Sequence, residues 1–204
     1  MKVLAVMAHP DDESCLVGGT LAQYARAGAE ITLVIATHGE AGTCQWCQGT
    51  ALGATRTQEL LCAARTLGIA RVIWLEGCHD GALMQCDADA MAKRIGGLIR
   101  DLKPNVILTL PRTPIDNHPD HRAVGLWTTL AFVNHRAASR VLYFALKREA
   151  GHVNPSAVRV DVTNVMEVKL RAVKCHRSQV ECWENLHADL TKGLTFEYLF
   201  PFSA

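Results

Sequence analysis

The stretch that decides the fold is KVLAVM-AHPDDE (residues 2–13), in which an apolar run leads directly into a histidine and three acidic residues. Such a near-continuous apolar run is typical of a strand that is buried on both faces of a parallel sheet. A second apolar run, VILTL (residues 106–110), is followed shortly by HPDH (residues 118–121). Each polar cluster follows the carboxyl end of an expected strand, and in open α/β sheets this is the edge where ligands bind. The sequence therefore predicts that the two clusters lie on the same rim of one sheet.

The rest of the chain alternates strand-like apolar runs with longer segments of helical period. We expect strands at 2–8, 31–36, 71–75, 105–110, 141–146 and 158–162. We expect helices at 14–28, 52–68, 87–102, 119–134 and 164–176, with a shorter helix near 180–190. Gly28, Gly68 and the Lys103-Pro104 pair mark expected helix ends. This alternation predicts an α/β fold with a doubly wound, mostly parallel sheet and helices on both faces.

The composition is that of one globular domain over residues 1–204. Of these residues 49% are hydrophobic and 20% are charged, which suits a sizeable core. A net charge of +1 gives no electrostatic basis for binding nucleic acid or a membrane surface, and no apolar stretch reaches membrane-spanning length. The first apolar run ends in acidic residues, unlike a signal-peptide cleavage site, so we expect a cytoplasmic protein. The apolar helix faces are also compatible with a homo-oligomer.

The eight cysteines are many for a chain of 204 residues. In a cytoplasmic enzyme the simplest interpretation is that they are reduced thiols that fill the core. Cys44 and Cys47 form a Cys-x-x-Cys pair, which can bind zinc or cycle as a disulfide. The pair lies in a long loop without further ligands beside it, so we expect it to have a local role. A thiol-based redox or metal-sensing protein that uses Cys44 and Cys47 is the alternative from a different functional class.

The two polar clusters contain the donors of a hydrolytic metal site, which uses three protein ligands and leaves one position for water. His9 and Asp12 are three residues apart across a turn, so both side chains can point at one site, and His121 can supply a third ligand from the second cluster. Asp11 would then be free to act as a base. For either motif alone, a turn or a helix N-terminus is the better explanation. The presence of both motifs after strands favours the metal site.

Two further residues of the second cluster, His118 and Asp120, are left for another role, and a carboxylate such as Asp120 can orient an imidazole. Zn²⁺ is the expected ion, with one per chain. A site of two histidines and one aspartate also accepts iron(II), cobalt or manganese, so the donor types leave the metal open.

The motifs AHPDDE (residues 8–13) and HPDH (residues 118–121) resemble those of the PIG-L/LmbE family of zinc-dependent de-N-acetylases. Weaker matches follow in the order of the family: GGTL (18–21), THGE (37–40), RTQE (56–59), LG (67–68), and Lys169 with HRSQ (176–179). The resemblance implies a Rossmann-like fold and a zinc ion with three ligands: His9, Asp12 and His121. It also implies that Asp11 is the general base. By the same resemblance, His118 paired with Asp120 stabilises the oxyanion or protonates the leaving amine.

The resemblance extends to residues that contact the substrate. Arg56 and Asp80 fall where members of this family contact the sugar. Arg56 is equally well explained as a surface helix residue that pairs with Glu59 or Glu40. Some members place a tyrosine two residues before the HPDH motif, where this chain has Asp116.

The expected activity is hydrolysis of an N-acetylated amino sugar, or of a glycoside that carries one such as N-acetylglucosamine, to acetate and a free amine. The expected partner is therefore a small molecule. Because the zinc chemistry requires only an accessible carbonyl, a hydrolase that acts on a non-sugar amide is the alternative within the same class.

Overall fold

The computed structural model describes residues 1–113 and 117–202, and these form a seven-stranded sheet in the order β3-β2-β1-β4-β5-β7-β6. Strands β1 to β5 are parallel to one another, and β7 is antiparallel to both β5 and β6. The strands are β1 (Lys2–Met7), β2 (Glu30–Ile35), β3 (Arg71–Trp74), β4 (Val106–Thr109), β5 (Val141–Leu146), β6 (Val158–Asp161) and β7 (Phe196–Pro201).

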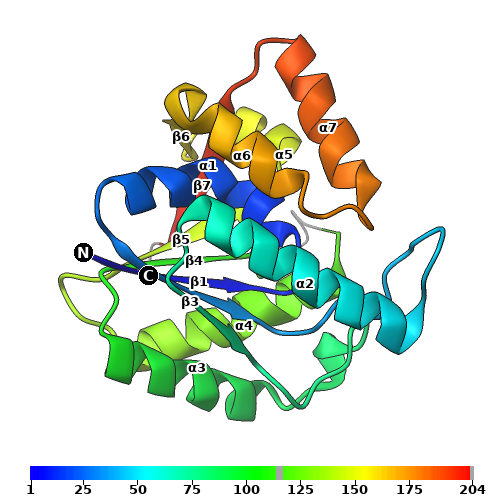
Figure 1. The fold of residues 1–204 in the computed structure, drawn as a ribbon. Helices are drawn as coiled ribbons and strands as arrows, with labels where there is room; N and C mark the ends of the chain where they lie inside the picture. The colour runs from blue at the N-terminus through cyan, green and yellow to red at the C-terminus, as the bar shows by residue number, and fades with distance from the viewer. Residues whose placement is uncertain (114–116, 203–204) are drawn as a thin grey trace.

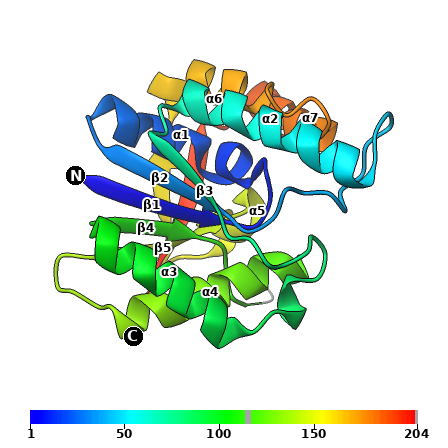
Figure 2. The same ribbon diagram turned by 60° about the horizontal axis from the view of Figure 1, so that its bottom comes forward.

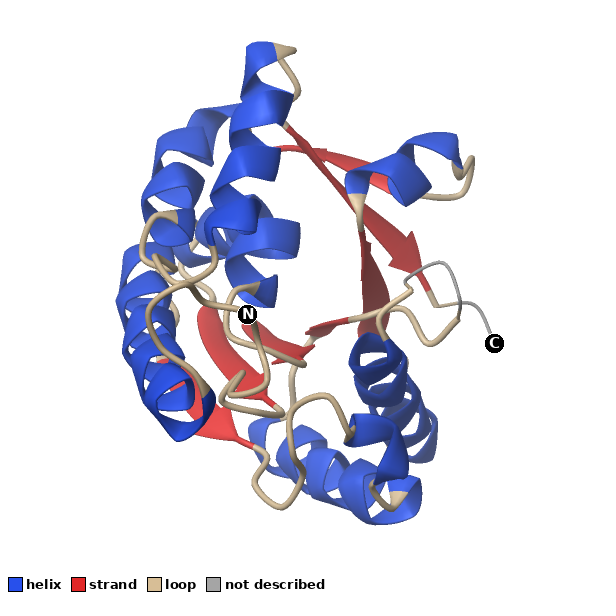
Figure 3. Ribbon diagram, turned by 90° about the vertical axis from the view of Figure 1, so that its right-hand side faces the viewer, coloured by secondary structure: helices blue, strands red, loops and turns tan. Residues whose placement is uncertain are grey.

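Helices cover both faces of this sheet. They are α1 (Asp12–Arg26), α2 (Gly49–Leu67), α3 (Ala88–Leu102), α4 (Pro119–Asn134), α5 (Arg148–Val153), α6 (Met166–Val173) and α7 (Val180–Thr191), with short 3₁₀ turns η1 (Leu83–Gln85) and η2 (Thr163–Val165). Figures 1 and 2 show α1, α2, α6 and α7 on one side of the sheet and α3 and α4 on the other. Figure 3 shows the strands passing between the two helix layers. The expected doubly wound, mostly parallel α/β fold is confirmed. None of the described helices is both long enough and apolar enough to cross a membrane.

Strand β1 lies at the centre of the sheet, between β2 and β4. Both β1 and β2 are buried from their second residue onward, which explains why their sequences are continuously apolar. From β1 the chain moves outward through β2 to β3, and it then crosses back to place β4 on the other side of β1. The strand order therefore reverses beside β1, and the loops that follow β1 and β4 diverge there. This is the position at which open α/β sheets bind ligands.

The expected elements are confirmed to within a few residues, but α5 and β7 were not predicted. In β7, the apolar sequence FEYLFP is interrupted by Glu197, which is buried. The Glu197 carboxylate accepts hydrogen bonds from the backbone N–H groups of Gly19 and Thr20, both at 2.7 Å, and lies 2.6 Å from Nζ of Lys169. These partners come from α1 and α6. A buried acid in a strand is therefore explained by the tertiary structure and not by the local pattern.

The expectation of reduced, core-filling cysteines is wrong for six of the eight. The structure pairs Cys15 with Cys182, Cys62 with Cys175, and Cys78 with Cys86 as disulfides, with Cα–Cα distances of 6.0, 5.8 and 6.2 Å. These distances lie in the usual range for a disulfide. The first bridge joins α1 to α7, and the second joins α2 to the segment after α6. Cys44 and Cys47 are free thiols.

Candidate metal and catalytic site

The turn between β1 and α1 brings His9, Asp11 and Asp12 to the end of the central strand. Asp11 has a φ of 124°, a conformation that residues other than glycine rarely adopt. Such backbone strain costs about 1–3 kcal/mol and persists only where the surroundings hold it. Here the Asp11 carbonyl accepts the N–H groups of Ser14 and Cys15 at 3.0 and 2.8 Å, and Asp12 begins α1 immediately afterwards. The turn therefore presents adjacent aspartates to the rim of the sheet.

The three expected metal ligands come together around Asp12. Its Oδ1 atom lies 3.1 Å from Nε2 of His121, and its Oδ2 atom lies 3.7 Å from Nδ1 of His9. All three residues are buried. The Asp12 Oδ2 atom also accepts the backbone N–H groups of Ala8 and His9 at 3.1 and 2.9 Å, which fixes the carboxylate. Burial alone would raise the pKa of Asp12, but the charge of His121 and its hydrogen bond outweigh burial and hold that pKa well below its ordinary value.

His118 joins this cluster from the turn before α4. Its ring centroid lies 4.7 Å from that of His9 and 4.6 Å from that of His121. His118 is the N-cap of α4, where its Nδ1 atom accepts the backbone N–H of Asp120 at 3.3 Å. Burial, together with the positive charges of His9 and His121, lowers the pKa of His118. Asp116, which stands where some family members have a tyrosine, lies outside the described residues.

The donor types at this site suit a divalent metal ion. Within the described residues, the ligand atoms of His9, His118 and His121 lie within 4.8 Å of one another, as do those of His9, Asp80 and Asp120. The expected set of His9, Asp12 and His121 combines two imidazole nitrogens with one carboxylate oxygen, which is the donor chemistry of catalytic zinc sites and related metals. The donor types therefore fit the ion that the sequence implies, although neither of the two compact groups includes Asp12.

Two carboxylates orient the ring of His9. Its Nε2 atom lies 3.0 Å from Oδ1 of Asp80 and 3.2 Å from Oδ2 of Asp120. Burial opposes protonation of His9, but the hydrogen bonds to Asp120 and Asp80 outweigh it and raise the pKa of His9 to about 10. The Asp120 carboxylate also accepts the N–H groups of Gly81 and Leu83 at 2.7 and 3.0 Å. Carboxylates placed in this way set the direction of a metal-binding imidazole.

These contacts differ in two respects from the sequence-based expectation. The Asp120 carboxylate contacts His9, whereas the hydrogen bond between Asp120 and His118 is made by the Asp120 backbone N–H. Asp80, expected to contact the sugar, has a side chain that is only 6% exposed. It is engaged by His9 and by the backbone N–H of Ala41 at 2.8 Å. Both aspartates therefore belong to the immediate surroundings of His9.

Arg56 lies beside Asp11 and not at the surface. Its Nη2 atom is 3.3 Å from Oδ2 of Asp11 and donates to the carbonyl of Pro10 at 2.6 Å, while Nη1 donates to the carbonyl of Gly39 at 3.0 Å. Arg56 is 4% exposed, so the surface interpretation of this residue is wrong. Burial raises the pKa of Asp11 to about 6; the Arg56 guanidinium opposes this rise and the Asp12 carboxylate adds to it.

The acids proposed as surface partners of Arg56 have other roles. Glu59 accepts hydrogen bonds from the backbone N–H and the hydroxyl of Ser178 at 2.8 and 2.6 Å. Glu40 accepts the backbone N–H of Asp80 at 3.1 Å. Each acid therefore ties together segments that lie far apart in the sequence.

The sequence-based reasoning missed the role of Glu13, which lies under the site and is fully buried. Its carboxylate accepts the backbone N–H of Asp11 at 3.0 Å and the hydroxyl of Ser14 at 2.6 Å, and it lies 2.8 Å from Nε2 of His176. Burial opposes protonation of His176, but the charge and hydrogen bond of Glu13 outweigh it and raise the pKa of His176. The signals in the sequence were that Glu13 ends the AHPDDE motif and that His176 begins the HRSQ match, but neither showed that the two side chains meet.

The sequence and the fold are similar to those of known deacetylases. Residues 4–132 match the family model described as PIG-L: GlcNAc-PI de-N-acetylase. A 1D-myo-inositol 2-acetamido-2-deoxy-alpha-D-glucopyranoside deacetylase of Nakamurella multipartita is 31% identical, over 88% of this chain and 80% of that protein. A Bacillus cereus protein described as "probable N-acetyl-alpha-D-glucosaminyl L-malate deacetylase 2" is also 31% identical, over 92% of this chain and 88% of that protein.

Among solved structures, the N,N'-diacetylchitobiose deacetylase of Pyrococcus horikoshii superimposes with a TM-score of 0.79 and 25% identity, covering 98% of this chain and 83% of that one. The match of the family model extends over more than half of the chain and contains both of its polar motifs. The chain therefore belongs to the PIG-L family of de-N-acetylases, as its two motifs indicated.

Proposed function

We propose that this protein is a metal-dependent hydrolase that removes the acetyl group from an N-acetylated amino sugar glycoside, releasing acetate and a primary amine. The observation that carries the proposal is the position of Asp12 between His9 and His121, with Asp11 beside it at the end of the central strand. Membership of the PIG-L family supports the type of reaction. The names of the relatives, which act on N-acetylglucosaminyl compounds, support the substrate class.

The ligands of one divalent metal ion would be His9, Asp12 and His121, and Zn²⁺ is the ion we propose. When bound, the metal supplies Lewis-acid activation of water and of the acetyl carbonyl. Asp80 and Asp120 would keep the His9 ring in the orientation that the metal requires.

Asp11 is the proposed general base. Its raised pKa makes it a stronger base than an ordinary aspartate, and the Arg56 guanidinium holds its carboxylate in place. His118 is the proposed proton donor to the leaving amine and the proposed partner of the developing oxyanion. Because its pKa is lowered, His118 is a strong donor once it carries a proton. The backbone N–H of Asp120 donates to the Nδ1 atom of His118, which orients the neutral ring with its N–H on Nε2.

The roles of Arg56 and Asp80 in binding the sugar stay predictions. Both side chains are already engaged, Arg56 with Asp11 and Asp80 with His9, so either would contact a substrate while also positioning a reacting group.

We also propose that residues 1–204 act as one domain, since one sheet runs through the described residues. A cytoplasmic location and a homo-oligomer stay predictions of the sequence.

The test is an assay of acetate and amine release by the metal-replete protein. The substrates are the N-acetylglucosaminyl glycosides of inositol and of malate, N,N'-diacetylchitobiose, and simple aryl amides. Release of both products from at least one sugar is the expected result. Ready cleavage of aryl amides without acetate from any sugar would retain a hydrolase and reject the sugar substrate.

A further inference from the structure

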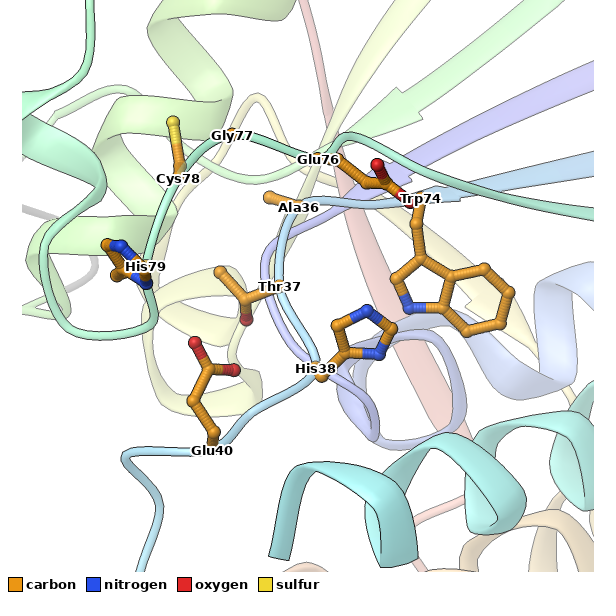
Figure 4. A pocket seen from close by; sticks show the side chains of 9 residues that line it. All are labelled: Ala36, Thr37, His38, Glu40, Trp74, Glu76, Gly77, Cys78 and His79. Carbon is orange, nitrogen blue, oxygen red and sulfur yellow. The ribbon is translucent and has the colours of Figure 1, made fainter. Parts of the chain in front are cut away.

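A cavity of about 190 Å³ lies at the carboxyl ends of β2 and β3, beside the proposed catalytic site (Figure 4). Its walls include Thr37, His38 and Glu40 from the segment after β2, and Trp74, Glu76 and His79 from the end of β3 and the segment after it. A volume of this size holds far more than one water molecule, so a small organic group fits. The mechanism proposed above uses none of these side chains.

The cavity shares its walls with the catalytic loops. Thr37 donates from both its backbone N–H and its hydroxyl to the carbonyl of Ala8, each at 3.1 Å, and Ala8 directly precedes His9. On the other side, the Glu40 carboxylate accepts the backbone N–H of Asp80, whose side chain contacts His9. The cavity is therefore connected to the metal ligand His9 through two sets of hydrogen bonds. A substrate whose acetamido group lies at the metal would have its next unit close to this cavity.

The walls combine a flat aromatic surface with a hydrogen-bond donor and an acceptor. The rings of His38 and Trp74 are stacked, with centroids 5.4 Å apart and planes inclined by 13°, and the His38 Nδ1 atom lies 2.7 Å from the hydroxyl of Thr57. The Trp74 Nε1 atom and the Glu40 Oε2 atom are buried and make no hydrogen bond within the described residues. A ligand that carries several hydroxyl groups offers both an acceptor for Trp74 and a donor for Glu40.

The charge of the walls argues against an anionic ligand. Glu40 and Glu76 contribute carboxylates, and no lysine or arginine is among the described residues that line the cavity. The neighbouring Arg94 donates to the backbone carbonyl of Glu76 and is not part of the lining. A carboxylate placed here would meet two like charges, and this repulsion would lower the affinity of the cavity for an anionic ligand.

From these features we infer that the cavity at the ends of β2 and β3 is the subsite for the aglycone. It selects an uncharged, hydroxyl-rich group, such as a cyclitol or a second sugar, over one that carries carboxylates. The inference rests on the proposed function, because an aglycone exists only if the substrate is a glycoside.

The test compares kcat/KM for three N-acetylglucosaminyl substrates: the inositol glycoside, N,N'-diacetylchitobiose and the malate glycoside. Wild-type protein should prefer at least one of the two uncharged substrates over the malate glycoside by tenfold or more. Glu76→Lys, at an exposed position, should raise the ratio of malate to inositol glycoside about three- to fivefold at low ionic strength, and less at high salt. Trp74→Phe, which keeps a ring and loses the N–H, should raise KM for the uncharged substrates more than it lowers kcat.

The matched control is Glu167→Lys, which makes the same charge change at an exposed position on α6 and should leave the ratio unaltered. A wild-type preference for the malate glycoside, or an unchanged ratio in Glu76→Lys, overturns the inference. If the ratio instead responds to Phe200→Ala, the aglycone lies in the apolar cavity lined by Phe144 and Phe200, and the inference is equally overturned.

If no sugar is deacetylated, the proposed function fails, and the inference is then judged by binding alone. Calorimetric titration of wild-type protein and of Glu76→Lys with the inositol and malate glycosides measures the same selectivity without turnover. Absence of a preference for the inositol glycoside in wild-type protein rejects the subsite.

Discussion

The Nε2 atom of His176 lies 2.8 Å from the Oε1 atom of Glu13, and both side chains are buried. The second oxygen of Glu13 accepts the backbone N–H of Asp11, the residue with the strained φ of 124°. The segment after α6 therefore supports the turn that carries the proposed base, although the two lie far apart in the sequence. An ion pair under a catalytic loop is expected to affect both folding and the position of that loop.

We predict that His176→Phe lowers the free energy of unfolding by about 3 kcal/mol, because it leaves the buried Glu13 carboxylate without its partner. The loss should depend on pH. The pKa of His176 is raised in the folded protein, so its stabilisation is complete below its unfolded value of about 6.5 and is lost as pH rises through the raised value. Urea unfolding at about pH 6 and about pH 9 should therefore show a larger difference from wild type at the lower pH.

The control for this prediction is His187→Phe. His187 is exposed and its ring stacks on Trp183, so this substitution removes a histidine without breaking the buried pair. It should change stability by less than about 0.5 kcal/mol. An equal loss in both variants, or a loss at His176 that is the same at both pH values, would contradict the assigned ion pair.

The metal-replete protein should contain one divalent ion per chain, and His121→Ala should lose most of it. Removing one of three ligands leaves Asp12 without the imidazole that lies 3.1 Å from its Oδ1 atom. Metal analysis after dialysis measures the stoichiometry, with His187→Ala as the control. Full metal content in His121→Ala would contradict the assigned set of three ligands, and the same measurement on His118→Ala would then test the neighbouring ring that is stacked on His121.

Asp11→Asn should keep its metal and lose turnover. The substitution preserves the shape of the side chain and its contact with Arg56 but removes its basicity, which typically costs about 10²–10⁴-fold in kcat. The measurement is kcat of the metal-loaded variant, with its metal content determined in the same preparation. Near-normal turnover would remove Asp11 from the mechanism.

Arg56→Lys should lower kcat more than it raises KM. The sequence alone predicts an effect through KM, because the family resemblance assigns Arg56 to sugar binding. In the structure the guanidinium contacts the Asp11 carboxylate and the carbonyls of Pro10 and Gly39, and a lysine cannot make all three contacts. Steady-state kinetics separates the two effects, and a change confined to KM would support direct sugar binding.

Cys44→Ser combined with Cys47→Ser should leave metal content and kcat/KM within a few-fold of wild type, which corresponds to about 1 kcal/mol or less in transition-state free energy. The two sulfur atoms are 3.3 Å apart in the loop between β2 and α2, and they are not part of the His and Asp cluster. Loss of activity in the double variant, with the metal retained, would support the alternative in which Cys44 and Cys47 carry a thiol-based function.

The parts of the fold that were predictable are those encoded by local patterns. The helix at 119–134 matches α4 to the residue, because Pro119 occupies the first helical position and the acidic Asp120 lies in the first turn. The strand at 141–146 matches β5 in the same way. The two polar motifs were recognisable because each follows a buried strand, and strand order then brings them to one rim.

The parts that were missed depend on contacts between distant segments. Nothing near Asp80 in the sequence shows that its carboxylate faces His9, and nothing near Glu197 shows that α1 and α6 supply its partners. The expected start of the first helix at residue 14 was late by two residues. A turn with a positive φ at Asp11 lets the helix begin at once. Arg56 contacts this turn at the carbonyl of Pro10 and the carboxylate of Asp11, and a linear pattern does not reveal such long-range contacts.

The central position of β1 has a consequence for how the protein assembles during synthesis. Strand β4, which pairs with one edge of β1, follows it by roughly 100 residues, so at about 5–20 residues per second that edge stays unpaired for about 5–20 s. His121 emerges later than β4, and His176 later still. A nascent chain therefore exposes an unpaired apolar edge of β1 before the segments that complete the proposed site have been made.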